Sequence, residues 1–191
     1  MRMVVVSFLG LAMATPAGPA AAQHRERGAH EHGRGTLNIA VEGARLSMEL
    51  EVPGVDIVGF EHAAKTGTQK AAVEKAKKLL SAPQALFKLP VSAGCAVTEA
   101  SATVENEDHD RAKGPEAKDG KTKDDDAKHS EFHATYAFNC KSPANITAIE
   151  FDYFRSFPGA QKLDVTVITA KGQTKFEVTR AKPRIDLAGM M

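Results

Sequence analysis

Hydrophobic and polar residues alternate along several stretches of the chain, as they do in strands that bury one face. The first two stretches, residues 35–40 and 45–52, flank the turn residues Glu42 and Gly43. Apolar side chains occupy every second position in both, with polar or charged side chains between them. They predict an amphipathic hairpin that covers a core with one face and leaves the other face in water.

The second half of the chain continues this pattern, in stretches rich in β-branched and aromatic residues: 95–104, 131–140, 146–151, 163–170 and 175–179. Residues 68–81 break it, because their apolar side chains recur every three or four positions and so predict a helix. Thr66 or Thr68 can cap this helix, and Pro83 ends it. Together the elements predict a mainly β fold, an antiparallel β-sandwich of about seven strands or a sheet, with one covering α-helix.

Three connecting segments are predicted to lack regular structure. Residues 55–62 form an irregular apolar connection, and residues 153–159 form an aromatic turn that plugs the core. Residues 105–130 contain almost no apolar side chains and many Asp, Glu and Lys, which is typical of a solvated, mobile loop. The sequence therefore predicts one domain with a charged insert.

The first 22 residues have the features of a signal peptide. A short basic start precedes a mostly apolar run at residues 4–14, and Ala20 and Ala22 supply the small side chains that a signal peptidase requires. The apolar run is too short to span a membrane. We expect cleavage after Ala22, secretion, and a single domain of residues 23–191 that does not span the membrane.

Charge and cysteine content narrow the classes of partner. The chain carries a formal net charge of +1, and Arg2 is the only charged residue of the leader, so the remainder is neutral. A nucleic-acid partner would favour a basic patch, and the sequence contains none. Cys95 and Cys140 are the only cysteines, and in an oxidising compartment such a pair most simply forms a disulfide. Metal binding by these thiols is the alternative, which their wide spacing disfavours.

The seven histidines are the main candidates for chemistry. His30 and His32 stand two residues apart, so an extended backbone would point both imidazoles to one side. His62 follows the apolar connection, and His133 lies on a predicted strand. Neutral imidazole is a ligand for zinc, copper and nickel. The sequence predicts a metal site of His30, His32, His62 and His133, with the first pair on a movable lead.

Each histidine also has a plainer interpretation. The segment that contains His30 and His32 can equally be a polar tail. His62 can be a residue whose ring has a backbone partner, and His133 can be an exposed residue of a strand. His109 and His129 flank the charged insert and are interpreted as solvated, with at most a transient metal contact. His24 would be the second residue after cleavage, where it could chelate copper together with a free terminal amine.

Common enzyme signatures are absent from the sequence. It contains no G-x-S-x-G, H-E-x-x-H, P-loop or G-x-G-x-x-G motif. A catalytic zinc would need a nearby base, for which Glu61 and Glu131 are the obvious candidates. We therefore expect a protein that is not an enzyme and has no catalytic residues.

Several segments, taken in order, carry a family resemblance: residues 29–33, 37–43, 58–62, Cys95, Cys140 and residues 154–159. In this order the chain resembles the zinc-regulated ZrgA proteins of Gram-negative bacteria over nearly all of its length after the leader. The resemblance implies a periplasmic zinc-binding protein that works with an ABC-type zinc importer under zinc limitation. Family members often carry a histidine-rich central insert, whereas here the insert has only His109 and His129 among acids and lysines.

The leading hypothesis is a periplasmic protein that captures Zn²⁺ and supports its uptake through an ABC-type importer. A copper- or nickel-binding protein that uses the same histidines is the second hypothesis, because Cu²⁺ and Ni²⁺ also bind nitrogen ligands. The third is a β-sandwich interaction module without metal.

Overall fold

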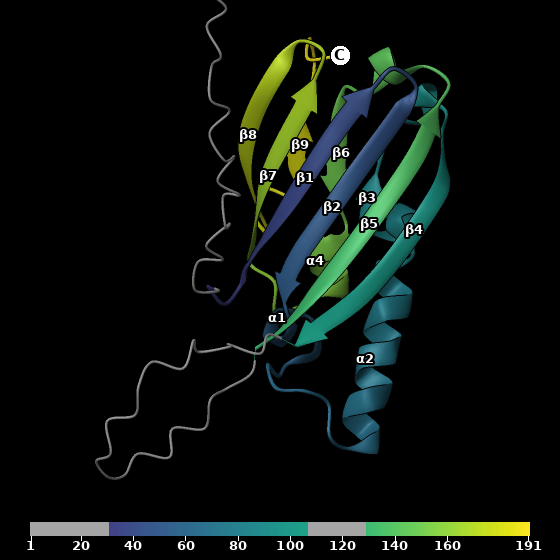
Figure 1. The fold of residues 1–191 in the computed structure, drawn as a ribbon. Helices are drawn as coiled ribbons and strands as arrows, with labels where there is room; N and C mark the ends of the chain where they lie inside the picture. Colours follow the sequence, from purple (N-terminus) through teal and green to yellow (C-terminus); the bar gives the residue numbers. More distant parts are fainter. Residues whose placement is uncertain (1–30, 107–128) are drawn as a thin grey trace, which may run out of the picture.

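A computed structural model describes residues 31–106 and 129–191, and it is mainly β (Figure 1). Six strands form one sheet in the order β4-β5-β2-β1-β7-β8. Their bounds are β1 (Arg34–Glu42), β2 (Arg45–Pro53), β4 (Cys95–Asn106), β5 (Ser130–Cys140), β7 (Lys162–Thr169) and β8 (Gly172–Thr179). Neighbouring strands are antiparallel, except for β1 and β7, which are parallel. The predicted strands are confirmed, but the sheet is mixed, because alternation sets the face of a side chain and not the direction of a strand.

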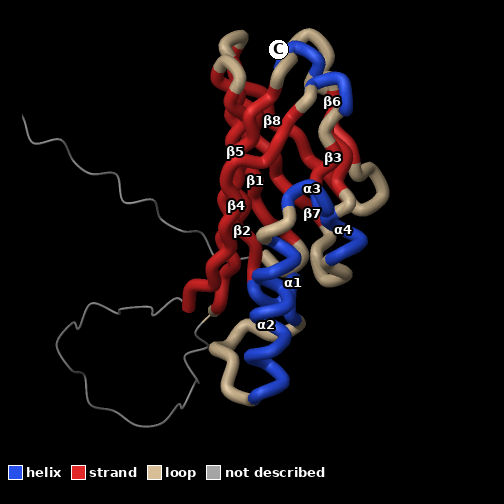
Figure 2. The backbone as a smooth tube through the Cα atoms, turned by 90° about the vertical axis from the view of Figure 1, so that its right-hand side faces the viewer, coloured by secondary structure: helices blue, strands red, loops and turns tan. Residues whose placement is uncertain are grey.

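A smaller sheet and short helices complete the fold. The small sheet has the order β3-β6-β9, with bounds β3 (Phe87–Lys88), β6 (Ala148–Phe151) and β9 (Arg184–Asp186). The helices are α1 (Gly54–Val58), α2 (Gly67–Leu80), α3 (Pro83–Leu86) and α4 (Tyr153–Ser156), with 3₁₀ turns at Val91–Ala93 and Pro143–Asn145. Figure 2 shows the small sheet and the helices on the same side of the large sheet. The two sheets make a sandwich-like arrangement, and none of the described elements covers the other face of the large sheet.

The core lies between these layers. The inward side chains of β1 and β2 are buried, and Leu37, Leu46 and Met48 among them are at most 1% exposed. The aromatic turn supplies Tyr153 and Phe157, which are buried beside one another with ring centroids 5.2 Å apart. Its predicted role as a plug of the core is therefore confirmed.

The helices differ in how far the sequence predicts them. Helix α2 lies where the apolar period places it, and Thr66 and Gln69 form a capping box at its start. Helix α1 was not predicted, because residues 55–62 read as irregular. A five-residue helix is too short to display a helical stripe, so the pattern of residues 54–58 gives no sign of it.

The disulfide between Cys95 and Cys140 is confirmed, and it joins the paired ends of β4 and β5. Neither thiol is therefore available as a metal ligand. At the other end of the two strands, β4 runs on to Asn106 and β5 begins at Ser130. Both strands therefore reach into residues 105–130, which the sequence assigns to the charged loop. Residues 107–128, the predicted signal peptide and His30 lie outside the described residues. None of the described helices is long and apolar enough to cross a membrane.

Candidate metal centre

A carboxylate with a histidine on each of its oxygens is the first candidate centre. Oε1 of Glu61 contacts Nε2 of His32, and Oε2 of Glu61 lies 2.7 Å from Nδ1 of His129. The Glu61 side chain is 23% exposed, and the two histidines are 64% and 37% exposed. We call Glu61, His32 and His129 the Glu61 group.

Three segments of the chain bring the Glu61 group together. His32 lies in the turn that leads into β1, Glu61 follows α1, and His129 immediately precedes β5. The carbonyl of Glu61 accepts a 2.6 Å hydrogen bond from the backbone N–H of Ser130, which fixes the third segment to the second. Figure 1 shows α1 at the lower end of the large sheet, near the end of β2 and the start of β5.

His62 is next to Glu61 in sequence, but its ring packs in another direction. It stacks on Phe60, with ring centroids 5.1 Å apart and an angle of 23° between the planes. Its Nδ1 lies 3.0 Å from the carbonyl oxygen of Ala63, and its Nε2 lies 3.5 Å from the amide nitrogen of Gln69. The backbone partner that the sequence analysis left open is therefore present, and the ring remains exposed at the border of the Glu61 group.

His133 stands among carboxylates on the outer face of the large sheet. Its Nε2 lies 3.0 Å from Oε2 of Glu131 and 3.7 Å from Oε2 of Glu105, and its Nδ1 lies 3.9 Å from Oε1 of Glu51. Strand register produces this set, because Glu51 pairs with His133 across β2 and β5 while Glu105 pairs with Glu131 across β4 and β5. We call these four residues the His133 group.

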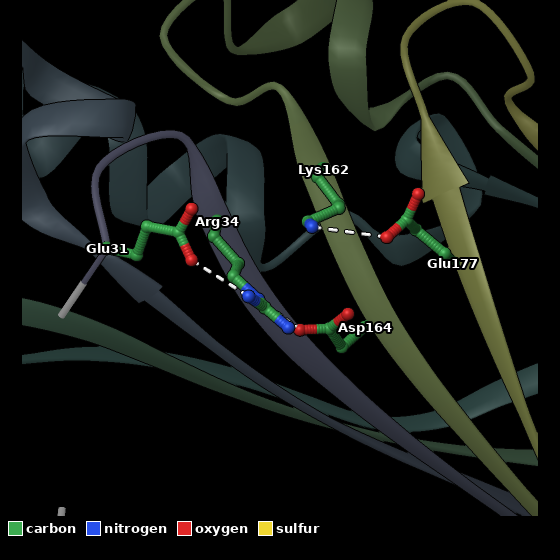
Figure 3. A network of polar contacts seen from close by, with 5 residues as sticks. All are labelled: Glu31, Arg34, Lys162, Asp164 and Glu177. Atoms are coloured by element: carbon green, nitrogen blue, oxygen red, sulfur yellow. Dashed lines mark hydrogen bonds and ion pairs between the residues drawn. The ribbon is translucent and has the colours of Figure 1, made fainter. Parts of the chain in front are cut away.

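Salt bridges hold the start of β1, which carries the histidine segment. Arg34 contacts Asp164 of β7 and lies 2.8 Å from Oε2 of Glu31, while Lys162 and Glu177 pair beside them at 3.1 Å (Figure 3). The hydrogen bond and charge of Arg34 lower the pKa of the exposed Glu31 carboxyl. The same two carboxylates raise the pKa of Arg34, so this anchor stays charged at all physiological pH values.

A buried carboxylate lies behind the Glu61 group. Asp56 of α1 is 5% exposed, and its Oδ1 accepts a 2.8 Å hydrogen bond from the backbone N–H of Gly33. Burial raises the pKa of Asp56, while the Gly33 hydrogen bond and the charge of His32 oppose that rise. Burial also raises the pKa of Tyr153 strongly, and the neighbouring Asp56 charge adds to this effect.

The chemistry of these residues suits zinc, which binds imidazole nitrogen and carboxylate oxygen. In residues 31–106 and 129–191, however, no three or more His, Cys, Asp or Glu side chains stand as a group that could hold a metal ion. The Glu61 group offers the matching donors, with the carboxylate between the two rings. A metal ion there would require these side chains to turn toward a common point.

The fold alone does not identify the family of the protein, but a comparison with known protein families does. Residues 29–187 match the family described as "ZrgA family zinc uptake protein". The chain belongs to the ZrgA family. The resemblance inferred from the sequence is thereby confirmed, together with a role related to zinc uptake. A search of curated proteins finds no significant match to the chain.

The ligands predicted for this ZrgA family member do not all lie together in the structure. His32 belongs to the Glu61 group, His62 stands at its border, His133 belongs to the other group, and His30 lies outside the described residues. The central position of Glu61 and its contact with His129 were not predicted from the sequence. The sequence signals only the place of His129 at the end of the sheet, because His129 directly precedes a strongly alternating strand, and it does not signal which carboxylate His129 meets.

Proposed function

We propose that this ZrgA family member is a periplasmic protein, not an enzyme, that captures Zn²⁺ and supports its uptake through an ABC-type importer. The supporting observation is that both oxygens of the Glu61 carboxylate contact imidazoles brought from distant segments. The family match supports zinc as the ion. The Cys95–Cys140 disulfide supports an oxidising compartment, and the signal-like leader supports export to it.

We propose Glu61, His32 and His129 as the centre of the capture site, with His30 as the neighbouring imidazole on the same lead. His62 and His133 stay predictions and are tested alongside. A capture protein must also release its ion, and a site formed by partly exposed side chains from three segments can open without disturbing the core. Protonated imidazole cannot coordinate zinc, so we expect the zinc affinity to fall as the pH is lowered.

Zinc titration of metal-free residues 23–191 against a chromophoric chelator tests the proposal. We expect stoichiometric binding, and a fall in affinity by at least about 100-fold when His32 and His129 are both changed to alanine, since two of the donors are lost. His62→Ala and His133→Ala, made separately, measure whether those rings contribute. Competition with Cu²⁺ and Ni²⁺ tests the choice of metal. An unchanged zinc affinity in the double variant would exclude the Glu61 group as the site.

A further inference from the structure

Asp56 is a carboxylate that the fold buries at a cost. Removing an ionised group from water is unfavourable unless hydrogen bonds replace the lost hydration. Only Oδ1 of Asp56 has such a bond, from Gly33, and Oδ2 is buried without a hydrogen-bond partner among the described residues. A group held at this cost and so close to a candidate site calls for a role in that site.

Asp56 lies where three segments of the chain meet. It belongs to α1, the helix that leads directly into the connection carrying Glu61. Its hydrogen-bond donor, Gly33, is the residue after His32. The third segment is the aromatic turn: Gly159 packs so closely that a Cβ added there would lie 2.6 Å from the carbonyl oxygen of Asp56. Asp56 thus links the backbone next to His32 with the backbone that leads to Glu61.

Gly33 is restrained from its other side as well. Its carbonyl oxygen accepts hydrogen bonds of 2.8 Å from the backbone N–H groups of both Gln161 and Lys162. Its φ of +82° favours glycine, and an added Cβ would lie 2.9 Å from Cγ of Gln161. These hydrogen bonds fix the orientation of the backbone at Gly33. The N–H of Gly33 donates its hydrogen bond to the side chain of Asp56.

We propose that Asp56 is a positioning residue of the metal site, which sets the place of His32 relative to Glu61 through the N–H of Gly33. This inference rests on the proposed zinc capture by the Glu61 group. Asp56 itself binds no metal in this arrangement. Its part is to keep the imidazole within reach of the carboxylate before the ion arrives, so that binding does not first have to order the lead.

Two substitutions of Asp56 separate the effect of its hydrogen bond with Gly33 from the effects of its charge and its size. Asp56→Ala removes the acceptor for Gly33, whereas Asp56→Asn keeps an acceptor oxygen of the same reach. We expect Asp56→Ala to weaken zinc binding about 10-fold, the lower range for loss of an orienting partner, and Asp56→Asn to stay within about twofold of the wild type. Glu99→Gln, which changes an exposed carboxylate on β4, is the matched control and should leave the affinity unchanged. Equal zinc affinity of the alanine variant and the wild type would overturn the inference.

Amide hydrogen exchange of the metal-free protein tests the same contact without zinc. We expect the N–H of Gly33 to be protected in the wild type and in Asp56→Asn, and to exchange at least about 10-fold faster in Asp56→Ala. Rapid exchange of Gly33 in the wild type would overturn the inference even if the alanine variant does not fold. If the N–H of Gly33 is protected but the zinc titration of the wild type shows no binding, the result counts against the proposed function instead. The hydrogen bond between Gly33 and Asp56 would then be present without a zinc site.

Discussion

The Glu61 group and the His133 group combine the same two residue types in opposite ways. In the first, one carboxylate lies between two imidazoles, and its members come from three segments outside the sheet. In the second, one imidazole lies among three carboxylates, and all four residues come from adjacent strands. Strand register fixes the second group, while hydrogen bonds of the connecting segments hold the first. A site that must take up and release an ion fits the first arrangement better.

His32 and His133 also differ in exposure. The His32 side chain is 64% exposed, whereas His133 is 19% and Glu131 8% exposed. Nε2 of His133 is buried and makes no hydrogen bond of normal geometry within residues 31–106 and 129–191, so its 3.0 Å contact with Glu131 is chiefly electrostatic. We infer that His133 mainly balances charge within the sheet, and that His32 mainly offers a nitrogen to a ligand. Three predictions test this contrast.

The largest expected difference is in zinc affinity. Glu61→Gln removes the negative charge between the two imidazoles, and we expect at least about 100-fold weaker binding, beyond the 10- to 100-fold typical of outer partners. Glu131→Gln is the matched change in the His133 group, and we expect it to stay within about threefold of the wild type. Chelator competition at constant pH measures both. Weaker binding in the Glu131 variant than in the Glu61 variant would reverse the assignment of the two groups.

The next difference is in stability without metal. His133→Ala removes the imidazole that separates Glu131 from Glu105, two residues that face each other in register. Like charges directly opposite destabilise a sheet, so we expect the free energy of unfolding to fall by about 1 kcal/mol. His32→Ala is the control at a mostly exposed position, with an expected change within about 0.5 kcal/mol. Urea unfolding followed by circular dichroism compares them, and equal losses would remove the proposed contrast.

The two groups also show where sequence reasoning reaches its limit. The strands, helix α2 and the disulfide were predictable, because alternation, the apolar period and an isolated cysteine pair are visible without knowledge of the fold. The contact of Glu61 with His129 was not, because it joins residues far apart in sequence and depends on where β5 begins. His133 was correctly placed on a strand, but its carboxylate neighbours depend on the register with β2 and β4. Composition reports which donors exist, and only the topology decides which of them meet.

The smallest expected effect concerns Asp56, the buried carboxylate next to the Glu61 group, and the sign of the effect follows from the direction of its pKa shift. Burial raises the pKa of Asp56, so the folded protein holds this proton more tightly than the unfolded chain does. The stability gained from the proton is fully present below the ordinary aspartate pKa, about 3.9, and is lost as pH rises through the folded-state value. Asp56→Asn carries no such proton.

The free energy of unfolding of the wild type, taken relative to Asp56→Asn, should therefore decrease as pH rises above the ordinary aspartate range. Urea unfolding of the metal-free proteins over a pH series from about 4 to 8 measures this difference, because groups that titrate in both proteins cancel. A difference that grows in favour of the wild type would mean that the Gly33 hydrogen bond and the charge of His32 outweigh burial. In that case Asp56 would resemble an ordinary ion-pair partner, and the contrast between a restrained lead at the Glu61 group and a register-fixed set at the His133 group would weaken.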